Sequence, residues 1–355
     1  MAKDHEIKYC QIGGQGVLEG VMMRAPEKSA LAVRRADGSI ATKVWDTKKI
    51  TNKFLRLPLV RGVVSLVDSM YSGVKIISDS ARLYDEQDVE SYEPNDFEKF
   101  IAKKTGKDAM SVMMLFAVII ALVLSVGLFF FLPQLLISAL NPIITSPLLR
   151  VLVEGVIRIL IFIGYLLLCT LMKDIKRVFM YHGAEHKTIA CYEAGEPLDV
   201  EHARTKRRLH PRCGTSFLLL VMIIAILLYA CMDVLFGLNN NLWIRMATRL
   251  ICLPIIAGIS YEVLKLCAKY ENWFTKALRW PGMQLQRLTT KEPTDDILEI
   301  GILAFELALN EKSEEELEAL KHSFEHIVPV EEQEKQEKQE KQPVTEDDPD
   351  EAGEN

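Results

Sequence analysis

The residues best suited to chemistry lie in the segment His182-Gly183-Ala184-Glu185-His186. On a helix, positions i, i+3 and i+4 share one face, so two imidazoles can reach one metal ion with a carboxylate beside them. Neutral imidazole nitrogens are common ligands for zinc and similar divalent metals. We therefore interpret His182 and His186 as metal ligands and Glu185 as a catalytic general base. The alternative is a solvated or hydrogen-bonded helix face that binds no metal.

A metal centre needs a further protein ligand, and the sequence offers three sources. The first is the pair His210 and Cys213. If both residues bind the metal, they complete a tetrahedral structural site; if only one binds, a coordination position stays open for catalysis. The second is Glu193, which follows on the same predicted helix. The third is Glu262, a carboxylate within an apolar segment, where it is costly without a partner. The sequence leaves these alternatives open.

Four apolar segments must position these residues relative to a membrane. Each reaches the roughly 20 residues needed to cross a hydrocarbon core. They cover residues 109–132, 148–172, 215–236 and 243–268. We expect a mainly α, polytopic membrane protein with four transmembrane helices, a small N-terminal β element, an amphipathic helix and a central cytoplasmic loop.

The distribution of basic residues predicts the orientation of these spans. The central loop, residues 173–214, carries nine lysines and arginines, whereas the connections 139–147 and 237–242 carry none. Because cytoplasmic loops retain positive charge, this loop and both termini are expected in the cytoplasm. Four of the arginines, Arg204, Arg207, Arg208 and Arg212, could also hold an anionic group.

The soluble segments divide the rest of the chain. Asp37-Gly38 between two alternating runs predicts a β-hairpin within region 1–56. Residues 57–84 have the apolar spacing of an amphipathic helix, residues 85–108 form an acidic linker, and residues 109–268 form the membrane domain. Cytoplasmic helices follow over 269–310, where Trp273 and Trp280 are typical of a membrane interface, and residues 311–355 form a disordered acidic tail.

Composition excludes some classes of function. The net charge of -6 owes much to the acidic tail, so it indicates no nucleic-acid partner. The seven cysteines lack the spacing of a disulfide framework. The glycines of Gly13-Gly14-Gln15-Gly16 lack the spacing of a phosphate-binding loop, and tight backbone turns or close packing explain them better.

With these residues in hand, the chain resembles the uncharacterised bacterial YqhQ-like family of membrane proteins. The resemblance covers about residues 12–309 and is carried by the segments 13–24, 57–62, 182–187, 210–217 and 260–262. It implies a multi-pass protein of the bacterial cytoplasmic membrane. Members are sometimes described as predicted metal-dependent enzymes.

Together, these patterns favour a cytoplasmic-membrane metalloprotein that binds a divalent metal, zinc being the best candidate. The H-x-x-E-H order also occurs in inverted zinc peptidases, so hydrolysis is the natural reaction class. The expected partners are the lipid bilayer and a cytosolic or headgroup-level substrate, and the chain could form a homo-oligomer. The alternative is a non-catalytic membrane scaffold or assembly factor that recruits cytosolic partners.

Overall fold

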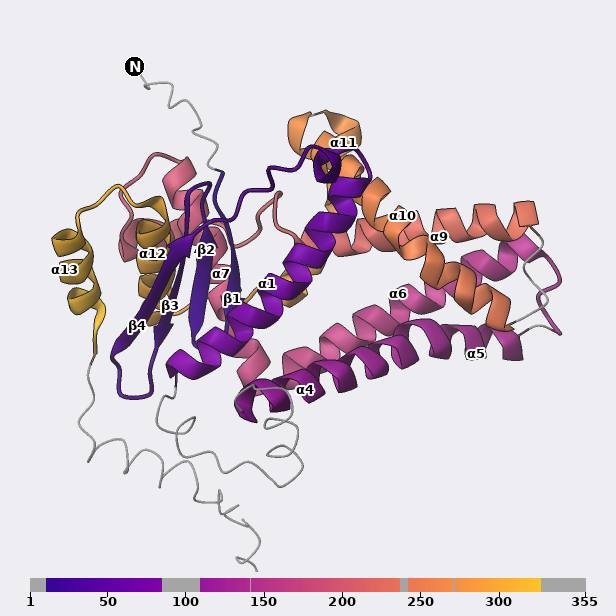
Figure 1. Ribbon diagram of the computed structural model, residues 1–355, viewed down its shortest axis with the longest axis horizontal. Coiled ribbons are helices and arrows are strands. Elements are labelled where there is room, and N and C mark those ends of the chain that lie inside the picture. Colours follow the sequence, from indigo (N-terminus) through magenta and orange to yellow (C-terminus); the bar gives the residue numbers. More distant parts are fainter. Residues whose placement is uncertain (1–10, 85–108, 141, 237–241, 271, 327–355) are drawn as a thin grey trace, which may run out of the picture.

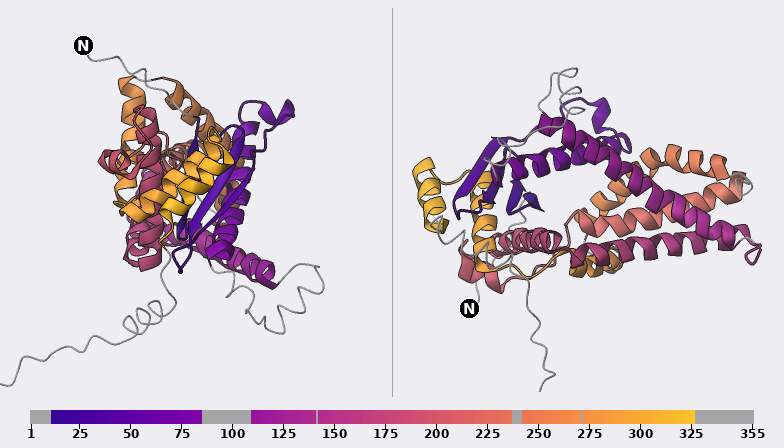
Figure 2. Two further views of the ribbon diagram at one scale, coloured as in Figure 1. Left: turned by 90° about the vertical axis from the view of Figure 1, so that its left-hand side faces the viewer. Right: turned by 90° about the horizontal axis from the view of Figure 1, so that it is seen from below.

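A computed structural model describes residues 11–84, 109–140, 142–236, 242–270 and 272–326 of the chain. In Figures 1 and 2 a small sheet and the yellow C-terminal helices lie at one end, and long helices extend to the other. The predicted acidic linker, residues 85–108, and residues 327–355 of the predicted tail lie outside the described residues.

The extended end of the molecule consists of four apolar helices, as the sequence predicts. The first span combines α4 (Ala109–Val126), the π-helical turn η2 (Gly127–Phe131) and α5 (Leu132–Ala139). The others are α6 (Pro147–Leu171), α9 (Thr215–Phe236) and α10 (Leu242–Lys269). Each is long and apolar enough to cross a membrane.

A buried polar network joins these spans. Glu154 on α6 accepts hydrogen bonds from Arg158 on the same helix, at 3.0 Å, and from Arg249 on α10. Arg249 also donates to Gln134 on α5 at 2.9 Å, and both guanidinium groups lie over the ring of Tyr229 on α9. The Glu154–Arg158 pair, whose members lie four residues apart on α6, is therefore part of a larger network in which every span takes part. Buried charges of this kind need partners, and each arginine has them.

The other end of the molecule contains a four-stranded antiparallel sheet in the order β1-β2-β3-β4. The strands are β1 (Gly13–Val17), β2 (Gly20–Arg24), β3 (Lys28–Arg34) and β4 (Ile40–Asp46). The predicted hairpin is the β3–β4 pair, and Gly38 in its turn has a positive φ of 83°. The sheet is larger than predicted, because the glycine-rich segment forms the edge strand β1.

Helices cover both faces of this sheet. One face, which includes Val21, Met23 and Ala32, packs against α7 (Lys173–Glu193) and α12 (Asp295–Leu309). The opposite face packs against the amphipathic helix α1 (Val60–Tyr84), which follows the short turn η1 (Phe54–Arg56). The first face forms the main hydrophobic core, which therefore unites the N-terminal region, the central loop and a C-terminal helix.

Three shorter helices complete the described chain: α8 (Val200–Thr205), α11 (Trp273–Thr289) and α13 (Glu314–Phe324). The prediction of disorder from residue 311 onward was wrong for α13. Its N-terminus has a capping box, in which the Ser313 side chain accepts from the Glu316 amide while the Glu316 carboxylate accepts from the Ser313 amide. This reciprocal pair satisfies amides that the first helical turn leaves free.

Candidate metal centre

The H-x-x-E-H segment lies on α7, where the helix passes beneath the edge strand of the sheet. A Cβ atom at Gly16 of β1 would lie 2.5 Å from the His182 amide nitrogen and 2.8 Å from the Val178 carbonyl oxygen. Only a glycine allows this approach, because a side chain would push strand and helix apart. Gly16 therefore serves close packing, and it fixes the helix turn that carries His182.

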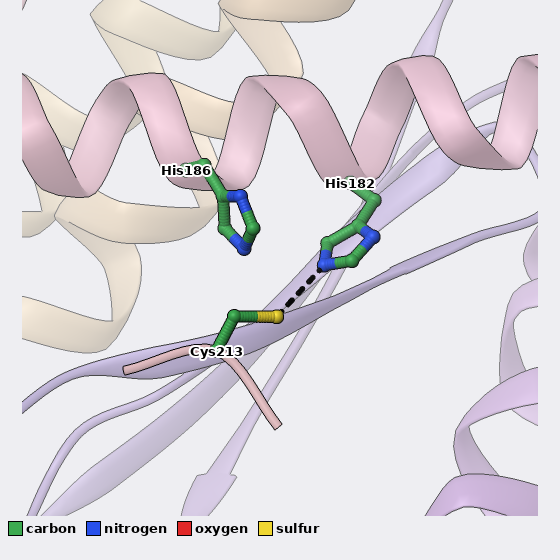
Figure 3. Close-up of side chains that lie close together, drawn as sticks. All are labelled: His182, His186 and Cys213. Carbon is green, nitrogen blue, oxygen red and sulfur yellow. Dashed lines mark hydrogen bonds between the residues drawn. The ribbon is translucent and has the colours of Figure 1, made fainter. Parts of the chain in front are cut away.

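Two histidines of α7 and one cysteine converge. His182 and His186 project from the same side of the helix toward Cys213, which lies in the loop before α9 (Figure 3). The His182 Nε2 atom is 3.2 Å from the Cys213 Sγ atom, and the ligand atoms of all three residues lie within 4.8 Å of one another. Among the described residues, this is the one group of at least three such side chains that could hold a metal ion.

The second nitrogen of each imidazole contacts a backbone carbonyl. His182 Nδ1 lies 2.8 Å from the Thr289 oxygen at the end of α11, and His186 Nδ1 lies 2.5 Å from the Arg208 oxygen. A carbonyl can only accept, so both Nδ1 atoms carry a proton, and in the neutral form of each ring the Nε2 atom keeps its lone pair. This is the arrangement of histidines that bind metals, whose other ring nitrogen is held by a carbonyl or carboxylate.

Two buried polar atoms at the centre have no hydrogen-bond partner among the described residues: His186 Nε2 and Glu185 Oε2. The Glu185 Oε2 atom lies 3.9 Å from His182 Nε2. Burial raises the pKa of Glu185, and burial lowers the pKa of His186, which favours its neutral form. Since buried polar atoms are almost always paired, these two fit a site that takes an ion and a water molecule.

His210 lies beside the cluster but outside it. Its Nε2 atom is 3.6 Å from the Glu193 carboxylate, which also pairs with Arg212. Burial would favour the neutral acid, but the neighbouring His210 and Arg212 outweigh it and lower the pKa of Glu193. The His210 ring nevertheless lies only 5.7 Å from that of His186, centroid to centroid. The structure thus brings Cys213 to the two α7 histidines and pairs the two other nearby candidates, His210 and Glu193, with each other.

The third candidate ligand, Glu262, is not brought to the cluster. It forms an ion pair with Arg61 at the contact between α1 and α10, and its carboxylate also faces the Leu59 amide at 3.4 Å. A partner was needed for a carboxylate near the end of a span, and Arg61 supplies it. Helical periodicity could not reveal this pair, because its members lie about 200 residues apart in the sequence.

Most of the arginine cluster is used within the protein. Arg204 pairs with Asp295, Arg208 donates to the Thr290 carbonyl, and Arg212 pairs with Glu193. These contacts fasten α8 to the start of α12, and they fasten the loop before α9 to the ends of α11 and α7. They support a positioning role for these three side chains rather than a site for an anionic substrate.

Sequence reasoning missed the groups that orient the histidines. The backbone carbonyls of Thr289 and Arg208 could not be identified from residue type, because every residue has a backbone carbonyl. Gln286 on α11 was also missed, although it holds the His210 backbone with two hydrogen bonds of 2.8 Å. The His210 amide donates to the Gln286 Oε1 atom, and the Gln286 Nε2 atom donates to the His210 carbonyl. Its position on an amphipathic helix gave no signal of this contact.

Comparisons with known proteins agree with the family resemblance. The family described as "Protein of unknown function (DUF1385)" matches residues 57–311. A relative from Bacillus subtilis (strain 168), "Uncharacterized protein YqhQ", is 33% identical over 303 residues, which cover 82% of this chain and 90% of the relative. No solved structure matches the chain. The chain therefore belongs to the DUF1385 family and is similar to YqhQ over most of its length.

Proposed function

We propose that this protein is a membrane-bound metalloenzyme in which His182, His186 and Cys213 bind a zinc-like divalent ion. One observation carries the proposal: three ligand atoms converge within 4.8 Å while backbone carbonyls fix the tautomer of both imidazoles. A hydrogen-bonded helix face without a metal would not need two lone pairs directed at one thiol. A thiolate and two neutral imidazoles form a typical zinc ligand set.

The reaction class that suits this ligand set is hydrolysis. Three protein ligands leave a fourth position for water, as catalytic zinc sites do, whereas structural sites have four protein ligands. A bound ion would act as a Lewis acid and activate water for attack. Glu185, whose Oε2 atom is 3.9 Å from His182 Nε2, is placed to accept the proton from that water.

The substrate should be cytosolic or at the level of the lipid headgroups. Cys213 lies about five residues before Leu218, where the apolar segment of α9 begins, which corresponds to about 8 Å along a helix. The excess of basic residues in the loop 173–214 favours the cytoplasmic side. The centre would therefore act at the inner surface of the membrane and not within its hydrocarbon.

A cobalt-substituted protein tests whether the site has an open position. Cobalt(II) reports its ligands through its visible spectrum, and acetohydroxamate binds a metal that has a free position. We expect the detergent-purified protein to show a thiolate-to-cobalt band and a spectral change when acetohydroxamate is added. Glu185→Gln should keep the thiolate band, because Glu185 is not a ligand in this proposal.

A different outcome favours the second candidate function. His186 and Glu185 are only 1% and 4% exposed, which would also suit a closed structural site within a non-catalytic scaffold. If acetohydroxamate leaves the cobalt spectrum unchanged and His210→Ala alters it, His210 is the fourth ligand. The hydrolase proposal is then lost and the scaffold remains.

A further inference from the structure

Helix α11 exposes large aromatic side chains on one side. Trp273, Phe274 and Trp280 are 80%, 56% and 63% exposed. Trp273, Ala277 and Trp280 recur at helical spacing and form one exposed stripe, whereas Thr275, Gly282 and Gln286 are buried. Such a concentration of exposed tryptophan is unusual for a surface that faces only water.

The charge of α11 is of one sign. The helix carries Lys276, Arg279 and Arg287 and contains no aspartate or glutamate. A helix that combines tryptophan with basic residues and has no acidic ones matches the chemistry of an anionic lipid surface. A water-facing helix would instead be expected to mix both signs of charge.

The position of α11 fits a membrane interface. It follows α10, whose apolar segment ends at Cys267, and it packs along α9. Lys269 is the last residue of α10, and its ammonium group lies 5.2 Å from the centre of the Tyr270 ring. Aromatic and basic residues at the end of a span are the usual anchors at the headgroup level.

From these observations we infer that α11 lies in the headgroup region of the leaflet nearest the metal cluster and binds anionic lipids through Trp273, Trp280, Lys276 and Arg279. The stripe of Trp273 and Trp280 contacts the boundary between headgroups and acyl chains. The basic side chains contact lipid phosphates. The occupant of this surface is the bilayer, because the surface continues from a span that is itself surrounded by lipid.

The same helix holds the metal cluster by its buried side. The Thr289 carbonyl contacts His182 Nδ1, and Gln286 holds the backbone of His210 in the loop that supplies Cys213. The exposed side of α11 therefore faces lipid, while its buried side contacts His182 and the loop that carries Cys213. The inference about lipid contact does not rest on the proposed hydrolysis, since it requires neither metal nor catalysis.

Fluorescence quenching tests the location of Trp280. The chain has four tryptophans, so Trp45→Phe, Trp243→Phe and Trp273→Phe together leave Trp280 as the sole reporter. In liposomes we expect quenching by phosphatidylcholine brominated near the headgroup, and weaker quenching when bromine lies deep in the acyl chain. A matched protein that keeps only Trp45, in strand β4 of the sheet, should be quenched by neither lipid.

Three outcomes would overturn the inference. Emission from Trp280 that is as insensitive to bromine as emission from Trp45 would place α11 in water. Stronger quenching by deep bromine would place it in the hydrocarbon. Protection from bromine that increases with the protein-to-lipid ratio would show that a second copy of the chain covers the stripe.

Lipid charge provides an independent test. With Trp280 as the sole reporter, replacing part of the phosphatidylcholine with phosphatidylglycerol should shift the emission to shorter wavelength. Lys276→Glu with Arg279→Glu should abolish that shift, whereas Lys321→Glu on the distant helix α13 should preserve it. Equal emission in both lipid mixtures for the parent would contradict the assignment of an anionic lipid surface.

Discussion

His182 and His186 show how much of this site depends on backbone groups. The Nδ1 atom of His182 contacts the Thr289 carbonyl, and the Nδ1 atom of His186 contacts the Arg208 carbonyl. The Nε2 atoms of both rings lie near the Cys213 thiol. The residue types and the H-x-x-E-H spacing predicted the two histidines, and Cys213 was one of several candidate partners. The choice between Cys213, Glu193 and Glu262 could not be made from the sequence, because it depends on ion pairs between distant segments, such as Arg61–Glu262.

Gly16 provides a test at the scale of single residues. Gly16→Ala places a methyl group against the backbone of α7 at His182, and overpacking of this kind costs about 1–3 kcal/mol. We expect a lower thermal unfolding midpoint and weaker metal binding, measured by differential scanning fluorimetry and by metal titration. Gly13→Ala in the same strand is the control, because a Cβ there meets nothing within 4 Å. Equal behaviour of the two variants would refute the close-packing role of β1.

At the scale of elements, α11 packs along α9 and contacts His182 through the Thr289 carbonyl. The sequence predicts α11 poorly, because Pro281 and Gly282 in its centre are typical of a break, yet the helix runs from Trp273 to Thr289. Proline removes one amide, but packing of α11 along α9 compensates for the loss. The four spans, in contrast, were predictable, because length and hydropathy alone determine them.

Gln286 tests the positioning role of α11. Gln286→Leu removes both hydrogen bonds to the His210 backbone and frees the loop that carries Cys213. Loss of groups that orient metal ligands typically weakens metal binding about 10–100-fold, and we expect a decrease of this size in zinc affinity. Competition with a chromophoric chelator measures it. Gln284→Leu, on the same helix, should change the affinity little, and an equal loss in both variants would argue against a specific clamp.

At the scale of the whole molecule, segments far apart in the sequence build one soluble core beside the spans. Residues near 21–40, 181–203 and 297–308 share a hydrophobic cluster, so helix α7, which carries His182 and His186, is buried between a sheet and α12. The sequence predicted a hairpin, a charged loop and C-terminal helices as separate regions. Their association depends on contacts between residues more than 100 positions apart, which periodicity within one segment cannot reveal.

The predicted orientation can be tested with reporter fusions. Because basic residues concentrate in the loop 173–214, we expect the cluster and both termini in the cytoplasm. Green fluorescent protein joined after residue 326 should fluoresce, and alkaline phosphatase inserted in the connection 142–146 should be active. The opposite pattern of activities would reverse the orientation and place the metal cluster outside the cytoplasm.

The metal content of the purified protein tests the central claim most directly. We expect the detergent-purified parent to contain about one zinc-like ion per chain, because the three converging residues form one ligand set. Inductively coupled plasma mass spectrometry measures this metal content. His182→Ala, His186→Ala and Cys213→Ser should each lose it, whereas His202→Ala, which alters a histidine paired with Asp199 at the surface, should retain it. A parent with substoichiometric metal, and variants that do not differ from it, would contradict the account.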